Sequence, residues 1–371
     1  MFKAEIILDS IDKRGNRITT FKVTYPRIIH AEMCRHRILS RNSASSRAIP
    51  FNKMLQMVTE NPFIPIAWQK DHKGMQGSEY ITDEFEIDEI RFHWINASKS
   101  AIHQAKNLNT LGLTKQLCNR LLEPFLWHTE IITGTEWENF FNIRCPKYQT
   151  PVSQTIEPQR SWKDLMANHS NESNLIMIEK MSIIEKLNFN NSQAEIHIQA
   201  IAELMWDAIN DSVPQTIVDD WHIPFADNLE IPKLIDLAHN HITKNKPEYS
   251  PTAEELQSVV TELAIKIATA RCARISYETL GDNPKIDYEA DIKLHDRLLE
   301  QVPMSPFEHC AKAMSDKEYE LFVKGKVQNW GGESSLYEYG HLITSLILDT
   351  QAGWCNNFKG FIQYRYLIEN K

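Results

Sequence analysis

The segment that most constrains this chain is residues 35–47, which read RHRILSRNSASSR and contain four arginines and four serines. Guanidinium groups stay charged and are costly to bury unpaired, so this stretch has to line a surface or a binding site. Before it, the alternating residues 19–25 predict a half-buried strand ended by Pro26, and the apolar spacing over 28–34 predicts a short helix. We therefore expect the arginines to leave a short helix and enter a polar loop, where backbone N–H groups help to hold an anion.

An arginine-rich segment of this kind could hold a small phosphorylated ligand, bind nucleic acid or simply face solvent. The formal net charge of -9 weighs against a general nucleic-acid binder, because affinity for polyanions depends on the summed positive field. A single phosphate pocket needs no such field, so a small phosphorylated ligand is the preferred interpretation and no nucleic-acid partner is expected. The chain contains neither GxGxxG nor GxxxxGK[ST], which disfavours dinucleotide-binding oxidoreductases and P-loop enzymes.

The composition is that of an ordinary globular protein. The 371 residues are 42% hydrophobic and 24% charged, and no apolar run approaches membrane-spanning length. The N-terminal residues lack the apolar block of a secretory signal, so a cytoplasmic protein without a membrane partner is expected. The six cysteines form no CxxC pair, which predicts free buried thiols and no metal site, and Cys34 is interpreted as a packing residue.

Helical periodicity predicts an amphipathic helix over 85–108, ended by Gly112, whose apolar stripe faces the core. Further helices are expected over 193–209, 253–271 and 288–300. The asparagine-rich stretch 144–193 contains several prolines and is interpreted as an insertion or mobile loop. Because helices and strands alternate irregularly, the chain is assigned to the α+β class.

Several motifs resemble one enzyme family. Arg35-His36-Arg37, followed by Ser45 after seven intervening residues, resembles the signature of flavin-dependent thymidylate synthase. NRLLEP at 119–124, NFFNIR at 139–144 and QAEI at 193–196 follow in the order of that family. ARISY at 273–277 and SPFEH at 305–309 resemble fragments that ordinarily precede the arginine motif. The chain is thus similar to a circularly permuted, longer, phage-associated branch, which also has a tail like 357–365.

The resemblance implies a flavin-dependent thymidylate synthase-like fold, with a sheet flanked by helices in permuted order. It implies one domain over 1–371 with insertions near 146–190, 210–255 and 311–350, assembled as a homotetramer. The implied reaction transfers a one-carbon unit from methylene-tetrahydrofolate to C5 of dUMP, giving dTMP, with FAD as cofactor and NADPH as reductant.

The resemblance also assigns roles to individual residues. The expected flavin-binding residues are Arg35, His36, Arg37, Ile38, Asn42, Asn139, Ser276, Ser305 and Glu308. The expected dUMP-binding residues are Glu32, Arg35, Ser43, Ser45, Ser46, Arg47, Arg120 and Arg144. Of these, Arg144, Glu32 and Ser45 are expected to act at the reacting centre. Arg120 would reach the phosphate from a neighbouring subunit.

Three positions depart from the family pattern. Glu32 stands where glutamine is usual, Ser43 where glutamate is usual, and Pro303 where a histidine precedes SPFEH. These departures keep two alternatives open. One is a dUMP hydroxymethylase, in which water captures the activated methylene. The other is a non-catalytic nucleotide-binding or regulatory protein that kept the pocket.

Overall fold

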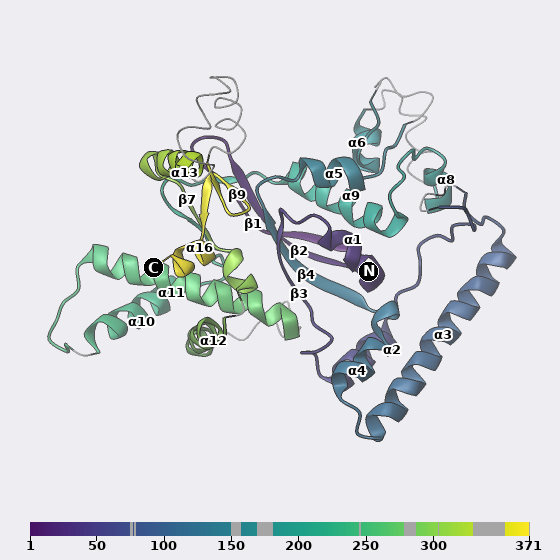
Figure 1. Cartoon of the computed structure of the whole chain (residues 1–371), viewed down its shortest axis with the longest axis horizontal. Coiled ribbons are helices and arrows are strands. Elements are labelled where there is room, and N and C mark those ends of the chain that lie inside the picture. The colour runs from purple at the N-terminus through teal and green to yellow at the C-terminus, as the bar shows by residue number, and fades with distance from the viewer. Residues whose placement is uncertain are drawn as a thin grey trace.

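The computed structural model describes residues 1–74, 77, 79–149, 157–168, 181–244, 246–277, 287–302, 304–328 and 353–370. Figure 1 shows a central sheet with helices packed around it, which confirms the predicted α+β class. The expected insertions near 146–190 and 311–350 lie partly outside the described residues. The single domain and the permuted thymidylate synthase-like fold stay predictions.

The central sheet has five strands in the order β3-β4-β2-β1-β5. The strands are β1 (Lys3–Ile11), β2 (Arg17–Pro26), β3 (Ser40–Ser43), β4 (Trp127–Gly134) and β5 (Gln215–Thr216). All neighbours are antiparallel except β1 and β5. The strand predicted over 19–25 is confirmed within β2, and its alternation turns the buried Phe21, Val23 and Tyr25 to one face.

Helices cover both faces of this sheet. On one face α5 (Glu138–Arg144) and α9 (Ile196–Asp211) pack against Phe21, Val23 and Ile132. On the other face, Ile131 packs with Cys272 of α11 (Ala253–Arg274). Two more helices pack on α11, namely α10 (Ile231–Thr243) and α12 (Tyr288–Gln301). Neighbouring residues of a strand point to opposite faces, so Ile131 and Ile132 anchor the two helical layers.

A smaller sheet ties the C-terminal segment to the central one. It has the order β10-β7-β6, formed by β6 (Trp221–His222), β7 (Ala311–Ala313) and β10 (Phe361–Gln363). Next to it lie the hairpin of β8 (Trp354–Cys355) and β9 (Phe358–Lys359), and the helices α13 (Asp316–Gln328) and α16 (Tyr364–Glu369). Phe358 and Phe361 are fully buried against Ile18 of β2, so the end of the described chain packs beside the central sheet.

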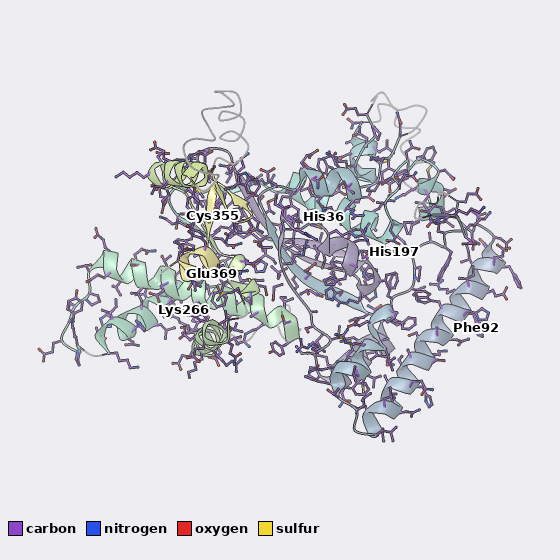
Figure 2. All side chains as sticks on the ribbon, viewed as in Figure 1. His36, Phe92, His197, Lys266, Cys355 and Glu369 are labelled. Atoms are coloured by element: carbon purple, nitrogen blue, oxygen red, sulfur yellow. The ribbon has the colours of Figure 1, made fainter. Side chains whose placement is uncertain are left out.

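A further group of helices lies on the opposite side of the molecule from the smaller sheet (Figure 1). They are α2 (Phe51–Glu60), α3 (Glu84–Thr110) and α4 (Lys115–Arg120). Asp83 caps α3 by accepting from the N–H of Glu86, and Gly112 follows its end at φ +82°, so the predicted helix is confirmed. Its apolar stripe is only partly covered, because Ala105 is buried while Phe85 is 80% exposed. Phe92, which lies off the stripe, is 61% exposed (Figure 2).

The stretch 144–193, interpreted as an insertion or mobile loop, contains regular structure. Its described residues include α6 (Trp162–Ala167) and α8 (Ile183–Leu187), while 150–156 and 169–180 lie outside the described part. Serine caps start both helices, since Ser161 and Ser182 accept backbone N–H groups of the first turn.

The arginine segment begins as predicted and then departs from the prediction. The short helix is confirmed as η1 (Arg27–Ile29) followed by α1 (His30–Cys34). The prediction of a polar loop after this helix is wrong for residues 40–43, because they form the edge strand β3. Ser40 and Asn42 are buried in this strand, so polar side chains occupy its inner face. A strand with polar residues inside has no apolar alternation by which a sequence could reveal it.

Among the described helices, none is long and apolar enough to span a membrane.

Candidate functional site

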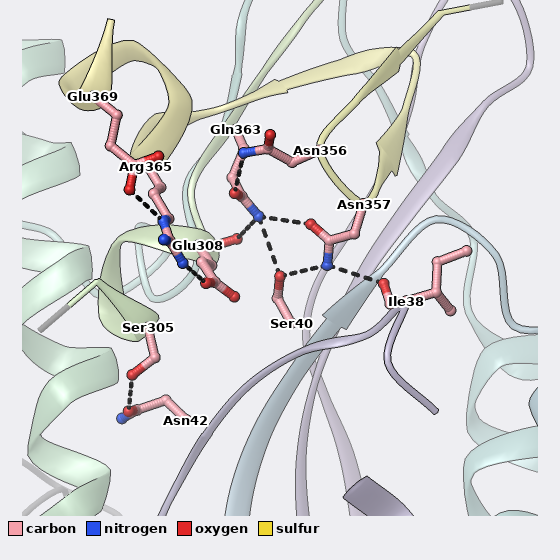
Figure 3. A network of polar contacts seen from close by, with 10 residues as sticks. All are labelled: Ile38, Ser40, Asn42, Ser305, Glu308, Asn356, Asn357, Gln363, Arg365 and Glu369. Atoms are coloured by element: carbon pink, nitrogen blue, oxygen red, sulfur yellow. Dashed lines mark hydrogen bonds and ion pairs between the residues drawn. The ribbon is translucent and has the colours of Figure 1, made fainter. Parts of the chain in front are cut away.

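The edge strand β3 is where distant parts of the chain meet. The 3-10 turns η3 (Ile275–Tyr277) and η4 (Ser305–Glu308) lie beside it. Asn42 donates to the carbonyl oxygen of Cys272 at 2.6 Å, and Ser305 donates to Asn42 Oδ1 at 3.1 Å (Figure 3). The backbone N–H of Ser45 donates to the carbonyl of Ser276 at 3.0 Å. Asn42 and Ser305 are 263 residues apart in sequence, so only the fold brings the two segments together.

Four charged or polar side chains beside α1 form what we call the anion cluster: Glu32, Arg35, His36 and Arg144. Arg144, at the end of α5, donates through Nε to His36 Nε2 at 3.0 Å. His36 is only 8% exposed and lies edge-on to the ring of Phe140. Burial and the neighbouring guanidinium groups of Arg144 and Arg41 lower the pKa of His36 to about 4. The imidazole is therefore neutral near pH 7 and accepts the hydrogen bond from Arg144.

The anion cluster has an unbalanced charge. Burial and the nearby charge of Arg35 lower the pKa of Arg144, and Glu32 partly opposes that shift. Glu32 Oε2 is buried and has no hydrogen-bond partner among the described residues. Two guanidinium groups close enough to repel each other favour an incoming anion, and the unpaired carboxylate oxygen can accept a donor from the same ligand.

The other arginines of the segment divide into two kinds. Arg35, Arg37 and Arg47 are exposed, and none of them forms an ion pair with any residue that the structure describes. Arg41 instead donates to the carbonyl oxygens of Met33, His36 and Cys34 at 2.8, 2.9 and 3.1 Å. Arg41, which was not among the expected ligand-binding residues, therefore satisfies carbonyls at the end of α1 and is a structural residue.

A second polar group, which we call the C-terminal clamp, consists of Ser40, Glu308, Asn357, Gln363 and Arg365 (Figure 3). The amide nitrogen of Gln363 donates to Ser40 Oγ at 3.1 Å, Asn357 Oδ1 at 2.9 Å and the carbonyl of Glu308 at 3.4 Å. Asn357 also donates to Ser40 Oγ at 2.8 Å. These contacts fix β3 and η4 to the C-terminal segment. Gln363 lies in the tail that resembles the family, but neither Ser40 nor Gln363 was among the expected site residues.

Glu308, an expected flavin ligand, has a protein partner. Arg365 donates to Glu308 Oε1 at 2.6 Å and to Glu369 Oε1 at 2.8 Å (Figure 3). The ion pair leaves the second carboxylate oxygen of Glu308 as its remaining acceptor and fixes the direction of that oxygen. Arg365 is thus a positioning residue for Glu308.

Some expected site residues lie apart from these contacts. Asn139 is exposed on α5, and its side chain forms no hydrogen bond within the described part of the chain. Arg120 is exposed at the end of α4, and Ile38 is 38% exposed.

Two expected dUMP-binding serines are engaged elsewhere in the fold. Ser43 pairs with Glu130 in the sheet, and the carbonyl of Ser46 accepts from Asn119 at 2.8 Å. Pro303 lies outside the described residues.

Among the described residues, no group of three or more histidine, cysteine, aspartate or glutamate side chains could hold a metal ion. The expectation of free buried thiols is confirmed for five of the six cysteines, but Cys34 is exposed, so its interpretation as a packing residue is wrong.

Comparisons with known proteins give only a distant likeness. No known family model matches the chain, and no curated protein matches it. The solved structures similar to this chain include a UMP/dUMP methylase PolB from Streptomyces cacaoi bound with 5-Br UMP, and the same protein bound with 5-Br dUMP. They are 14% and 12% identical to this chain, and both have a TM-score of 0.37. The matches cover 56% of this chain and 88% and 90% of those chains. At this TM-score the likeness carries no argument about activity.

Proposed function

We propose that this protein transfers a one-carbon unit from methylene-tetrahydrofolate to C5 of dUMP, giving dTMP, with FAD as cofactor and NADPH as reductant. The observation that carries the proposal is the contact of Asn42 with Ser305, because it joins the arginine motif to the SPFEH fragment across 263 residues. Two fragments of one family signature, separated in sequence and adjacent in space, support a permuted member of that family.

The anion cluster would bind dUMP. Its phosphate would be held by Arg35, Arg47 and Arg144, whose guanidinium groups match phosphate oxygens in shape and charge. The hydroxyl of Ser45 would add a further donor beside them. Neutral His36 would keep Arg144 oriented through the 3.0 Å hydrogen bond, so that the phosphate meets a fixed guanidinium. In a homotetramer, Arg120 of a neighbouring subunit would complete the site.

The residues around β3 fit a flavin. Ser276 and Ser305 offer hydroxyl groups for its polar edge, Asn42 positions Ser305 through their 3.1 Å hydrogen bond, and Glu308 offers an acceptor held in place by Arg365. The exposed Arg37 suits a diphosphate. When bound, FAD would supply the redox chemistry, taking hydride from NADPH. The protein would contribute positioning and electrostatic stabilisation.

The direct test is an anaerobic reaction of the purified protein with FAD, NADPH, methylene-tetrahydrofolate and dUMP, followed by mass spectrometry of the nucleotide. We expect product at the mass of dTMP. Unchanged dUMP, together with a protein that binds no flavin, would refute the proposal and favour a nucleotide-binding or regulatory protein.

One observation favours a second candidate function, dUMP hydroxymethylation. The buried, unpartnered Oε2 of Glu32 is a carboxylate acceptor that could hold and orient a water molecule beside the substrate. In the same reaction the product would then be heavier than dTMP by one oxygen. Glu32→Gln should lose that product and retain dTMP formation, because an amide is a much weaker base. Detection of dTMP alone from the unmodified protein would exclude this candidate.

A further inference from the structure

A buried side chain of α4 holds the backbone of the turn 45–49, which carries two of the proposed dUMP ligands. Asn119 Nδ2 donates to the carbonyl oxygen of Ser46 at 2.8 Å and to the carbonyl oxygen of Ile49 at 3.0 Å. An amide nitrogen has two protons, so these two hydrogen bonds use the whole donor capacity of the side chain. Asn119 therefore ties the beginning of the turn to its end.

A second side chain of α4 holds the middle of the turn. Lys115 Nζ donates to the carbonyl oxygen of Ala48 at 2.9 Å. The residues on both sides of Arg47, Ser46 and Ala48, therefore each have their carbonyl held by α4. Arg47 itself is exposed and forms no ion pair with any residue that the structure describes. The backbone around Arg47 is thus fixed while its guanidinium group stays free for a ligand.

The rest of the turn shows why these side-chain contacts matter. The carbonyl of Ser45 accepts from the backbone N–H groups of Ala48 and Ile49, both at 2.9 Å. Ile49 is 0% exposed and packs against the buried Cys118, so the end of the turn belongs to the hydrophobic core. None of residues 46–48 is fully buried or part of that core. Their position therefore depends on the hydrogen bonds from α4.

The environment of Asn119 argues against a role in packing alone. Asn119 is 0% exposed, and its Oδ1 has no hydrogen-bond partner among the described residues. A buried acceptor without a partner destabilises the folded protein, and an apolar side chain at this position would avoid that cost. What the amide adds is its pair of donors, which reach the turn and nothing else that the structure describes.

We infer that Asn119 and Lys115 are positioning residues for dUMP binding. They fix the turn 45–49 before the ligand arrives, so that Arg47 and the hydroxyl of Ser45 meet the phosphate in one preset arrangement. A turn that is already ordered loses less conformational freedom on binding, which strengthens affinity without a new contact. This role rests on the proposed function and extends it, because the resemblance assigns no role to either residue.

The first experiment compares Asn119→Ala with the unmodified full-length protein by isothermal titration calorimetry. The loss of two hydrogen bonds to the turn should weaken the affinity for dUMP by about tenfold. The affinity for FAD should stay unchanged, because the proposed flavin ligands lie outside the turn. The matched control is Asn109→Ala, at an exposed position of α3, which should change neither affinity.

The second experiment measures the order of the turn without any ligand. Trypsin cuts the Arg47–Ala48 bond only when the backbone there can open. In Asn119→Ala this bond should be cut about tenfold faster relative to the bond after Lys73, which lies in an exposed segment. Lys115→Met removes only the exposed donor and should accelerate the same cut by a smaller factor.

The outcomes separate this role from the proposed function. Unchanged dUMP affinity or an unchanged cut after Arg47 in folded Asn119→Ala would overturn the positioning role alone. Equal losses of dUMP and FAD affinity would also overturn it, because they indicate a general loosening of the fold. If Asn119→Ala does not fold, Lys115→Met decides the question, and an unchanged cut in that variant counts against the role. An unmodified protein that binds no dUMP would refute the proposed function, and the positioning role with it.

Discussion

The anion cluster and the C-terminal clamp are both polar, and distant segments form each of them, yet they differ in how far their hydrogen bonds are satisfied. In the clamp, Gln363 alone donates to three acceptors. In the anion cluster, Glu32 Oε2 has no partner among the described residues, and Arg144 lies near a like charge on Arg35. A saturated network holds segments together, whereas an unsaturated one retains the capacity to bind a ligand.

This difference predicts different responses to mutation. Removing a side chain from the anion cluster should weaken ligand binding and leave the fold intact. Removing Ser40, Asn357 or Gln363 from the clamp should destabilise the fold and leave dUMP affinity unchanged.

The largest expected effect is on binding, in Arg144→Ala. The loss of a charge-assisted hydrogen bond to phosphate costs about 1.5 to 3 kcal/mol, or roughly a 10- to 150-fold weaker affinity for dUMP. Isothermal titration calorimetry with dUMP measures it, and the unfolding midpoint should stay close to that of the unmodified protein. The matched control is Arg91→Ala, which removes an exposed arginine from α3. Equal affinity in both variants would contradict the assignment of Arg144.

The next effect is on stability, in Gln363→Ala. Gln363 is 1% exposed, and its loss leaves Asn357 Oδ1 and the carbonyl of Glu308 without this donor in the interior, while Ser40 Oγ keeps only its hydrogen bond from Asn357. A buried polar group left unsatisfied costs about 1 to 3 kcal/mol, so the free energy of unfolding in urea should fall by at least that order. Gln104→Ala, at an exposed position of α3, is the control. A stable Gln363→Ala protein that has lost dUMP affinity would reverse the roles of the two clusters.

The smallest expected effect is on the pH dependence of stability, in Glu130→Gln. Glu130 pairs with Ser43 of β3 in the sheet and accepts a hydrogen bond from Tyr25. Burial raises the pKa of Glu130 from 4.5 to about 7, with Tyr25 opposing the shift. The folded protein therefore holds this proton more tightly than the unfolded chain. The resulting stability is fully present below pH 4.5 and is lost as the pH rises through 7.

Glu130→Gln should remove up to about 1.4 kcal/mol per pH unit of that decline. Urea unfolding between about pH 5 and pH 8 measures it, with the exposed Glu89→Gln as control. The slope that remains should contain a decline from Glu203, whose pKa burial raises to about 7, and an opposing rise below pH 6.5 from His36, whose pKa is lowered to about 4. An unchanged slope would show that Glu130 is ionised in the folded protein throughout this range.

The sequence predicted those elements whose pattern is local. The strand over 19–25, the short helix before Arg35 and the long helices all follow from periodicity and from cap residues such as Asp83 and Gly112. Residues 40–43 were predicted wrongly, because Ser40 and Asn42 face the interior and are satisfied by partners more than two hundred residues away. No local pattern records such partners.

For the candidate site, the sequence by itself determined which residue types are available. They are an arginine-rich segment, a carboxylate at Glu32 and the hydroxyls of Ser276 and Ser305 in the ARISY and SPFEH fragments. Only the tertiary structure decided which of these side chains are already satisfied by the protein. Arg41 donates to carbonyls of α1, and Glu308 accepts from Arg365. Glu32 and Arg35, in contrast, keep unused hydrogen-bonding capacity. The physical reason is that a polar group has only a few donor and acceptor positions, and those that the fold pairs within the protein are no longer available to a ligand.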